Sequence, residues 1–173
     1  MKNKIVKYSV IACVCALAIF TVFSMVQPPL TSANASTAQE LARENIVVKK
    51  ANGEELIFSV EMALSGGEQA RGLMHRTNME ENHGMLFLFS GVSKRSFWMK
   101  NTLIPLDIIF LREDGSIHHI HHMAKPLDKT LVTSIEGSKA VLEINGGLSD
   151  QMGIQVGDKV YHNAFRNMNL LAE

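Results

Sequence analysis

The sequence predicts a mainly β fold: one small β barrel, closed or partly open, of about eight strands with one or two short helices, behind an N-terminal signal or anchor helix. Two observations lead to this prediction. Short runs rich in apolar and β-branched residues follow one another closely and are separated by turns that contain glycine. Little helical sequence lies between these runs, which argues against βαβ layers and favours a sheet that closes on itself.

The individual elements follow from local signals. Residues 46–48 and 56–62 are predicted strands joined by Asn52-Gly53, a dipeptide typical of hairpin turns. Ser65 is placed to cap a short helix after the second strand. The remaining predictions are strands over 85–89, 97–100, 106–111, 117–120, 140–144 and 160–162, and a helical turn over 146–152.

The first 35 residues are predicted to be a signal peptide. Three lysines precede an almost uninterrupted apolar run over residues 8–26, and Ala33-Asn34-Ala35 supplies the small-x-small pattern that a signal peptidase cuts. The alternative is an uncleaved membrane anchor, because the run falls within the roughly 17–25 residues of a short spanning helix. Both interpretations predict an exported domain, periplasmic or extracellular, which meets the membrane only through residues 8–26 if they are retained.

The rest of the chain divides into a linker over 36–44, the β domain over 45–166 and a C-terminal tail over 167–173. Both cysteines lie in the N-terminal segment, so the mature domain has neither a disulfide nor a cysteine nucleophile. Loss of the three N-terminal lysines leaves 14 basic against 17 acidic residues, a net charge near −3. This balance gives no basic field for nucleic acid. We expect the domain to be a monomer.

Residues 96–110 form the most apolar stretch of the mature chain, yet they include Lys100, Asn101 and Asp107. Side chains alternate across a strand, and this alternation carries Asp107 towards the rim of the interior. A carboxylate removed from water costs several kcal/mol unless it gains a partner. The candidate cations are Lys100, Arg71 and Arg95. The alternatives are an exposed aspartate at a strand start and a purely structural ion pair.

Two further charged residues lie where a pocket could use them. Arg71 precedes Gly72 late in the predicted helix, and arginine suits bidentate contact with the carboxylate of a protein residue or a ligand. Glu143 is a second carboxylate within an apolar strand. The alternative is that Glu143 lies on an edge strand and faces solvent.

Six short strings occur in an order that resembles the family catalogued as domain of unknown function 192. They are Arg71-Gly72-Leu73-Met74, Gly84-Met85-Leu86-Phe87, Phe97-Trp98-Met99-Lys100-Asn101-Thr102, Pro105-Leu106-Asp107, Val141-Leu142-Glu143 and Gly157-Asp158-Lys159-Val160. The resemblance covers approximately residues 46–162. It implies a small, mainly β domain, often behind an export signal, and it implies no established activity.

Residues 118–122 read His-His-Ile-His-His, outside the family pattern. In a strand, His119 and His121 would project from one face, and such a pair can chelate copper, nickel or zinc. Two ligands make an incomplete site, so other histidines would have to converge on it. The alternative is a solvated or pH-responsive strand edge. We expect no cofactor, with copper or zinc at His119 and His121 as the alternative.

No enzyme motif stands out. No serine lies in a Gly-x-Ser-x-Gly context, and the glycine pairs do not form a phosphate-binding loop. The leading hypothesis is therefore a binding module for a small molecule, glycan or peptide of the cell envelope, with Trp98 as a flat wall. Its predicted ligand-binding residues are Arg71, Met74, Trp98, Lys100, Asn101, Asp107 and Glu143. The alternatives are a metal-binding protein that uses residues 118–122 and a hydrolase that pairs Asp107 with Glu143 across a cleft.

Overall fold

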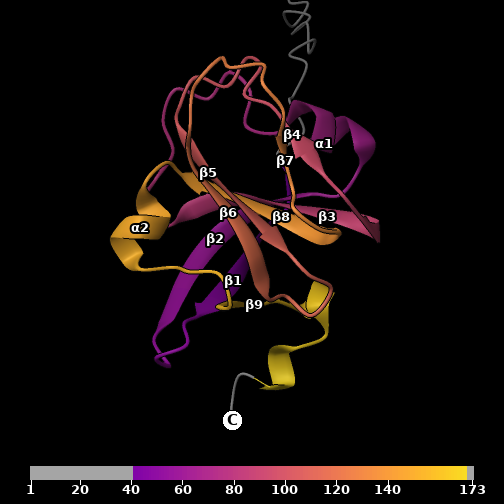
Figure 1. Ribbon diagram of the computed structural model, residues 1–173, viewed down its shortest axis with the longest axis vertical. Coiled ribbons are helices and arrows are strands. Elements are labelled where there is room, and N and C mark those ends of the chain that lie inside the picture. The colour runs from indigo at the N-terminus through magenta and orange to yellow at the C-terminus, as the bar shows by residue number, and fades with distance from the viewer. Residues whose placement is uncertain (1–40, 171–173) are drawn as a thin grey trace, which may run out of the picture. The chain divides into compact units, whose positions relative to one another are not determined.

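The computed structural model describes residues 41–170, which form a mainly β domain (Figure 1). The predicted signal peptide or anchor, most of the predicted linker and residues 171–173 lie outside the described residues. Across 41–170 there are nine strands and two short α-helices, and the main sheet curls into a half-barrel. The predicted fold class is confirmed in this form. Among the described helices, none has the length and apolar character needed to cross a bilayer.

The chain forms a seven-stranded sheet in the order β6-β5-β8-β3-β2-β1-β9 and a separate two-stranded ribbon of β4 and β7. The elements are β1 (Arg43–Lys49), β2 (Glu55–Ala63), α1 (Gly66–Arg71), β3 (His83–Ser93), β4 (Ser96–Phe97), β5 (Leu106–Leu111), β6 (Ile117–Ala124), β7 (Val132–Thr133), β8 (Ser138–Asn145), α2 (Leu148–Met152), β9 (Lys159–Tyr161) and the 3-10 turns η1 (Asn163–Phe165) and η2 (Met168–Leu170).

Local signals account for the hairpins and for α1. The hairpins β1–β2 and β5–β6 are antiparallel and form where the turn residues predict them. The Ser65 hydroxyl accepts a hydrogen bond from the Glu68 amide at 3.3 Å, and the Glu68 carboxylate accepts one from the Ser65 amide at 2.7 Å. This capping box satisfies two N–H groups that the first helical turn leaves unpaired. The predicted Ser65 cap is confirmed.

The pairing of β2 with β3 is parallel, and the sequence pattern does not predict it. Parallel neighbours need a crossover connection, and α1 with the following loop supplies it. The Gln69 side chain fastens this connection, because its Nε2 donates to the Leu88 carbonyl of β3 at 2.9 Å. The crossover therefore holds α1 beside β3, where the candidate site lies.

The two edges of the half-barrel meet at one end. The Ile117 amide donates to the Asp158 carbonyl at 2.8 Å, and the Val160 amide donates to the Gly115 carbonyl at 2.9 Å. These bonds connect the start of β6 with β9, beside an isolated bridge between Ser116 and Lys159. The sheet is thus partly open, with a hydrogen-bonded junction at the β5–β6 turn.

The strands β5 and β8 and the first half of β3, residues 84–87, are buried on both faces. An inner core fills the curl of the sheet. It includes Ile109 and Leu142, and all the remaining strands of the main sheet also contribute residues to it. An outer core lies on the other face and includes Phe87 and Phe110. Burial on both sides explains why these strands are almost continuously apolar in sequence. The predicted alternation of β5, with Ile109 on one face and Phe110 on the other, is confirmed.

The predicted strand over 97–100 is wrong beyond Phe97. The chain turns there, because Asn101 adopts a positive φ of 59° and the Thr102 amide donates to the Met99 carbonyl at 3.1 Å. The short β4 instead pairs with β7, a two-residue strand that the sequence does not reveal. Strands this short carry no alternation pattern of their own.

Gly115 and Gly53 provide a matched test of the edge junction. Both have nearly the same φ, 86° and 85°, but a Cβ at Gly115 would lie 2.2 Å from the Val160 carbonyl oxygen, whereas nothing lies within 4 Å at Gly53. Gly53→Ala should lower the free energy of unfolding by about 1–2 kcal/mol through backbone strain alone. Gly115→Ala should cost a further ~1–3 kcal/mol, because the clash disrupts the junction. Urea denaturation measures both, and equal losses would contradict the importance of this junction.

Candidate functional site

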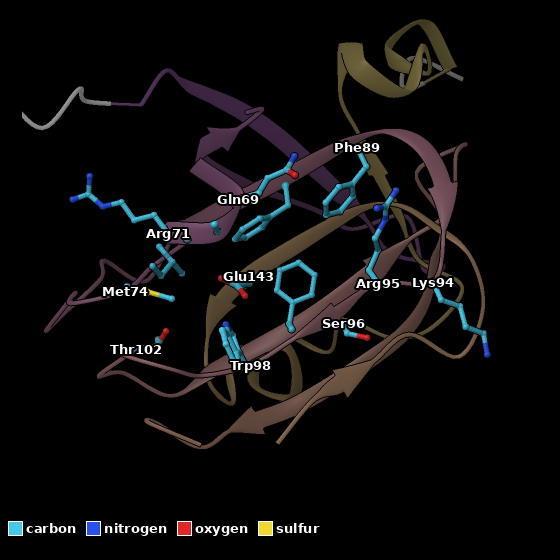
Figure 2. Close-up of a pocket in the computed structure, with 15 residues that line it drawn as sticks. Gln69, Arg71, Met74, Phe89, Lys94, Arg95, Ser96, Trp98, Thr102 and Glu143 are labelled. Atoms are coloured by element: carbon cyan, nitrogen blue, oxygen red, sulfur yellow. The ribbon is translucent and has the colours of Figure 1, made fainter. Parts of the chain in front are cut away.

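A pocket of about 520 Å³ opens on the outer face of the sheet, between α1 and the segment that contains β4 (Figure 2). Its walls carry four aromatic residues: Phe87, Phe89, Phe97 and Trp98. Phe87 and Phe89 lie two positions apart on β3 and so share one face. The Phe97 ring packs edge-on against Phe87, with 5.0 Å between ring centroids and an interplanar angle of 88°. This contact holds β4 against the sheet.

Glu143 lies at the floor of the pocket, and Figure 2 shows its carboxyl group in the middle of the labelled residues. It stands on β8 between Met85 of β3 and Ile108 of β5 in the strand register. The residue is 5% exposed, and its carboxyl group makes no hydrogen bond or ion pair with any residue in the described range. Burial raises the pKa of Glu143 to about 8. At neutral pH the group is therefore mainly a neutral acid that can donate one hydrogen bond.

Three cations line the same pocket: Arg71, Lys94 and Arg95. Arg71 and Lys94 are exposed and extend in opposite directions from the pocket in Figure 2; within residues 41–170 neither has an ion-pair partner. The Arg95 guanidinium lies 3.8 Å above the centre of the Phe89 ring, and its Nε is buried without an acceptor among the described residues. Backbone contacts with Ser134 hold Arg95 in place. The pocket thus combines aromatic walls, positive charge and one neutral acid.

Four of the seven predicted ligand-binding residues line this pocket: Arg71, Met74, Trp98 and Glu143. Lys100 and Asn101 do not line the pocket, but each contacts a residue that does. The Lys100 Nζ is 5.1 Å from the centre of the Trp98 ring, and the Asn101 Nδ2 is 3.8 Å from the Met74 sulfur. Sequence reasoning missed the phenylalanines, Lys94 and the pocket role of Arg95. The spacing of Phe87 and Phe89 was the available signal, but it also fits ordinary core packing.

Asp107 lies on the opposite face of the sheet from Glu143. It is fully buried, as alternation predicted, but the predicted cation partner is wrong. Its carboxylate accepts hydrogen bonds from the amides of Met123 at 2.9 Å, Gly147 at 2.8 Å and Ser149 at 2.9 Å, and from the Ser149 hydroxyl at 2.5 Å. Burial opposes ionisation of Asp107, but these hydrogen bonds outweigh it and lower the pKa.

The hydrolase hypothesis required Asp107 and Glu143 to face each other. Asp107 pairs with Ile144 across β5 and β8, so the two carboxyl groups are adjacent in register but point to opposite faces. They share no cleft. The Ser149 hydroxyl also contacts the His122 Nδ1 at 3.0 Å, but the serine is fully buried and lies between the aspartate and the histidine. A nucleophilic triad needs the histidine in the middle.

The histidine segment lies along a second, smaller pocket of about 250 Å³, which His119 and His121 both line. The His119 ring stacks on Phe110, with 5.1 Å between centroids. The His118 Nε2 contacts the Ser138 hydroxyl at 2.9 Å, and His162 contacts Glu44 at 2.9 Å instead of approaching the cluster. Burial lowers the pKa of His118 and His119. In the range 41–170, no three His, Cys, Asp or Glu side chains come together in an arrangement that could hold a metal ion.

The chain belongs to the family described as DUF192, uncharacterized ACR, whose model matches residues 47–162. It is similar to a crystal structure of a candidate transcription regulator from Sinorhizobium meliloti 1021, with 35% identity, a TM-score of 0.71 and coverage of 72% of this chain and 97% of the other. It is also similar to a protein of unknown function from Novosphingobium aromaticivorans DSM 12444, with 40% identity, a TM-score of 0.70 and coverage of 73% and 89%. No curated protein matches the chain.

Removal of the Asp107 carboxylate should destabilise the domain strongly. Asp107→Ala leaves the Gly147, Ser149 and Met123 amides without their acceptor, so we expect a loss of about 3–5 kcal/mol in the free energy of unfolding at pH 7. Asp107→Asn keeps an acceptor oxygen and should cost less. The folded-state pKa of Asp107 lies below 3.8, so the carboxylate stabilises the wild type less as the pH falls below that value. The loss of stability in either variant, relative to wild type, should therefore shrink at low pH. Urea denaturation from pH 2.5 to 7 measures it; a loss below about 1 kcal/mol would contradict the assigned role.

Glu143→Gln should remove the contribution of Glu143 to the pH dependence of folding stability. The folded protein keeps the Glu143 proton up to a pH of about 8, whereas the unfolded chain loses it near 4.5, so wild-type stability falls as the pH rises through this window. The glutamine side chain does not titrate, so the variant lacks this contribution to the pH dependence. Its free energy of unfolding should therefore rise relative to wild type by about 2–5 kcal/mol between pH 5 and 8.5. Parallel denaturation curves at both pH values check this, and a constant difference would show that Glu143 ionises normally.

Proposed function

We propose that this DUF192 domain is a ligand-binding module and that its ligand occupies the pocket above Glu143. The observation that carries the proposal is the unpaired carboxyl group of Glu143, which is 5% exposed and faces that pocket. A buried polar group without a hydrogen bond costs about 1–3 kcal/mol. A ligand atom that pairs with Glu143 would satisfy a carboxyl group that no group of the described protein satisfies.

The size and lining of the pocket support the same function. Its volume of about 520 Å³ falls within the roughly 300–1,000 Å³ of small-molecule sites. Such sites combine mainly apolar walls with a few placed polar groups. Here Phe87, Phe89, Phe97 and Trp98 form the walls, and Glu143 with the nearby cations supplies the polar groups.

Binding fits the lining better than catalysis does. Glu143 is the one carboxyl group among the residues that line the pocket, and no histidine, cysteine or tyrosine of the described chain joins it there. Ser96 and Thr102 also line the pocket, but neither hydroxyl is hydrogen-bonded to Glu143, and the Ser96 hydroxyl contacts Thr133 instead. General acid–base or covalent catalysis normally needs a second titratable group or a nucleophile within hydrogen-bond reach. A single neutral acid between aromatic walls is suited to orienting a ligand.

We further propose that the module works outside the cytoplasm as a monomer, on ligands of the cell envelope. The basic start, apolar run and Ala33-Asn34-Ala35 pattern support export. The description of one similar structure as a candidate transcription regulator does not carry over easily, because the whole chain has a formal net charge of zero and provides no basic field for DNA.

A fragment screen followed by heteronuclear NMR tests the binding function. We expect hits that shift the amides of residues 69–74, 94–98 and 143 together, and that change the fluorescence of Trp98, the single tryptophan of the chain. Trp98→Ala should weaken such a hit at least about fivefold, because an aromatic contact is worth about 1 kcal/mol beyond its buried area.

The matched control is Ile57→Ala, which removes an exposed apolar side chain of β2 that does not line the pocket. It should leave the affinity of the hit unchanged. If hits instead shift residues scattered over the domain, or none shifts the pocket, the proposed binding site is wrong.

A further inference from the structure

We infer that the ligand of this pocket is an anion carried on a flat apolar body, such as an aromatic carboxylate or phosphate. The inference rests on the proposed function and specifies the chemistry of the ligand. It is carried by three features of the pocket: donors without acceptors, cations without acidic partners, and exposed aromatic surface next to both.

The pocket presents hydrogen-bond donors that lack acceptors. The Arg95 Nε is buried with no acceptor within residues 41–170, although the Nη2 of the same guanidinium donates to the Gly91 carbonyl at 2.5 Å. Protonated Glu143 is a second donor without an acceptor. A buried donor such as the Arg95 Nε is normally paired. Together with the Glu143 carboxyl group, which faces the pocket, it favours a ligand that brings acceptor oxygens.

The charge around the pocket has one sign. Arg71 comes from α1, and Lys94 and Arg95 come from the connection between β3 and β4. No ionised carboxylate lines the pocket at neutral pH, because Glu143 is mainly protonated there. A cationic ligand could draw the proton from Glu143, but it would then face three positive charges and leave the Arg95 Nε unpaired. An anion gains from the positive potential of all three cations, although the exposed Arg71 and Lys94 side chains extend away from the pocket (Figure 2).

The apolar surface lies beside this charge. The Arg95 guanidinium covers the Phe89 ring, and the Trp98 ring, which is 46% exposed, has the Lys100 ammonium 5.1 Å from its centre. Aromatic faces suit a planar group, and the adjacent cations suit its charge. The pocket therefore matches a ligand whose flat body contacts the rings while its anionic oxygens reach Arg95 and Glu143.

Four probes that share one naphthalene ring test the class by isothermal titration calorimetry with the whole mature domain. They are 1-naphthoate, 1-naphthyl phosphate, the neutral 1-naphthalenemethanol and the cationic 1-naphthylmethylammonium. We expect both anions to bind at least tenfold more tightly than the alcohol, and the ammonium to bind most weakly. The ratio between the two anions then distinguishes a carboxylate ligand from a phosphate ligand.

Charge variants test whether the preference for anions arises at the pocket. Arg71→Gln and Lys94→Gln alter exposed side chains and should each weaken naphthoate binding severalfold without affecting the fold. The control Arg166→Gln makes the same change of net charge at an exposed residue outside the pocket, and it should leave the affinity unchanged. Equal losses in all three variants would show that net charge, and not the pocket, governs binding.

The pH dependence tests the donor role of Glu143. Glu143 is the one carboxyl group among the residues that line the pocket, and burial raises its pKa to about 8, inside the range from pH 7 to 9. Naphthoate affinity should fall severalfold over this range in the wild type, because the donor becomes a carboxylate. Glu143→Gln keeps an N–H donor at every pH and should remove that fall. An affinity that is independent of pH in the wild type would overturn the donor role.

The outcomes separate this inference from the proposed function. If the alcohol or the ammonium binds as tightly as the anions and shifts the pocket amides, the ligand class is wrong while the binding function stands. If no naphthalene probe and no fragment shifts the pocket amides, both are wrong.

Discussion

The burial of β5, β8 and the first half of β3 on both faces is the constraint on which the rest of this structure depends. A strand with one solvated face can carry polar residues at every second position without cost. A strand covered on both sides cannot, because each polar side chain must find a partner inside the protein or reach a pocket. The central strands contain two carboxyl groups, Asp107 and Glu143, and the domain treats them in opposite ways.

Asp107 is the structural case. Three backbone amides and a hydroxyl converge on its carboxylate, so it stays ionised in the interior and connects the start of α2 to β5 and β6. Glu143 is the other case. No group of the described chain pairs with it, it stays protonated to a pH of about 8, and it faces a pocket instead of a set of donors. The contrast separates a residue that stabilises the fold from one that is available to a ligand.

The residues around Glu143 determine which kind of ligand the pocket favours. The crossover through α1 brings Arg71 to one side of the pocket, and the residues that flank β4 bring Arg95 and Trp98 to the other. Family membership establishes the type of domain and its extent over residues 47–162, but the family carries no assigned activity. The chemical argument for a ligand therefore comes from the pocket itself: aromatic walls, unpaired donors and positive charge within one space.

The sequence by itself determined the local elements: the hairpin at Asn52-Gly53, the cap at Ser65, most strand positions and the alternation that buries Asp107. These depend on residues close together in the chain. Only the tertiary structure decided the parallel pairing of β2 with β3, the ribbon of β4 with β7, and the separation of Asp107 from Glu143 onto opposite faces. Alternation shows which side chains of one strand share a face. It cannot show how a residue of β5 is aligned with a residue of β8, whether both faces of a strand are covered, or which distant segment covers them. The pocket is assembled from such distant segments, so its chemistry emerges only when they pack together.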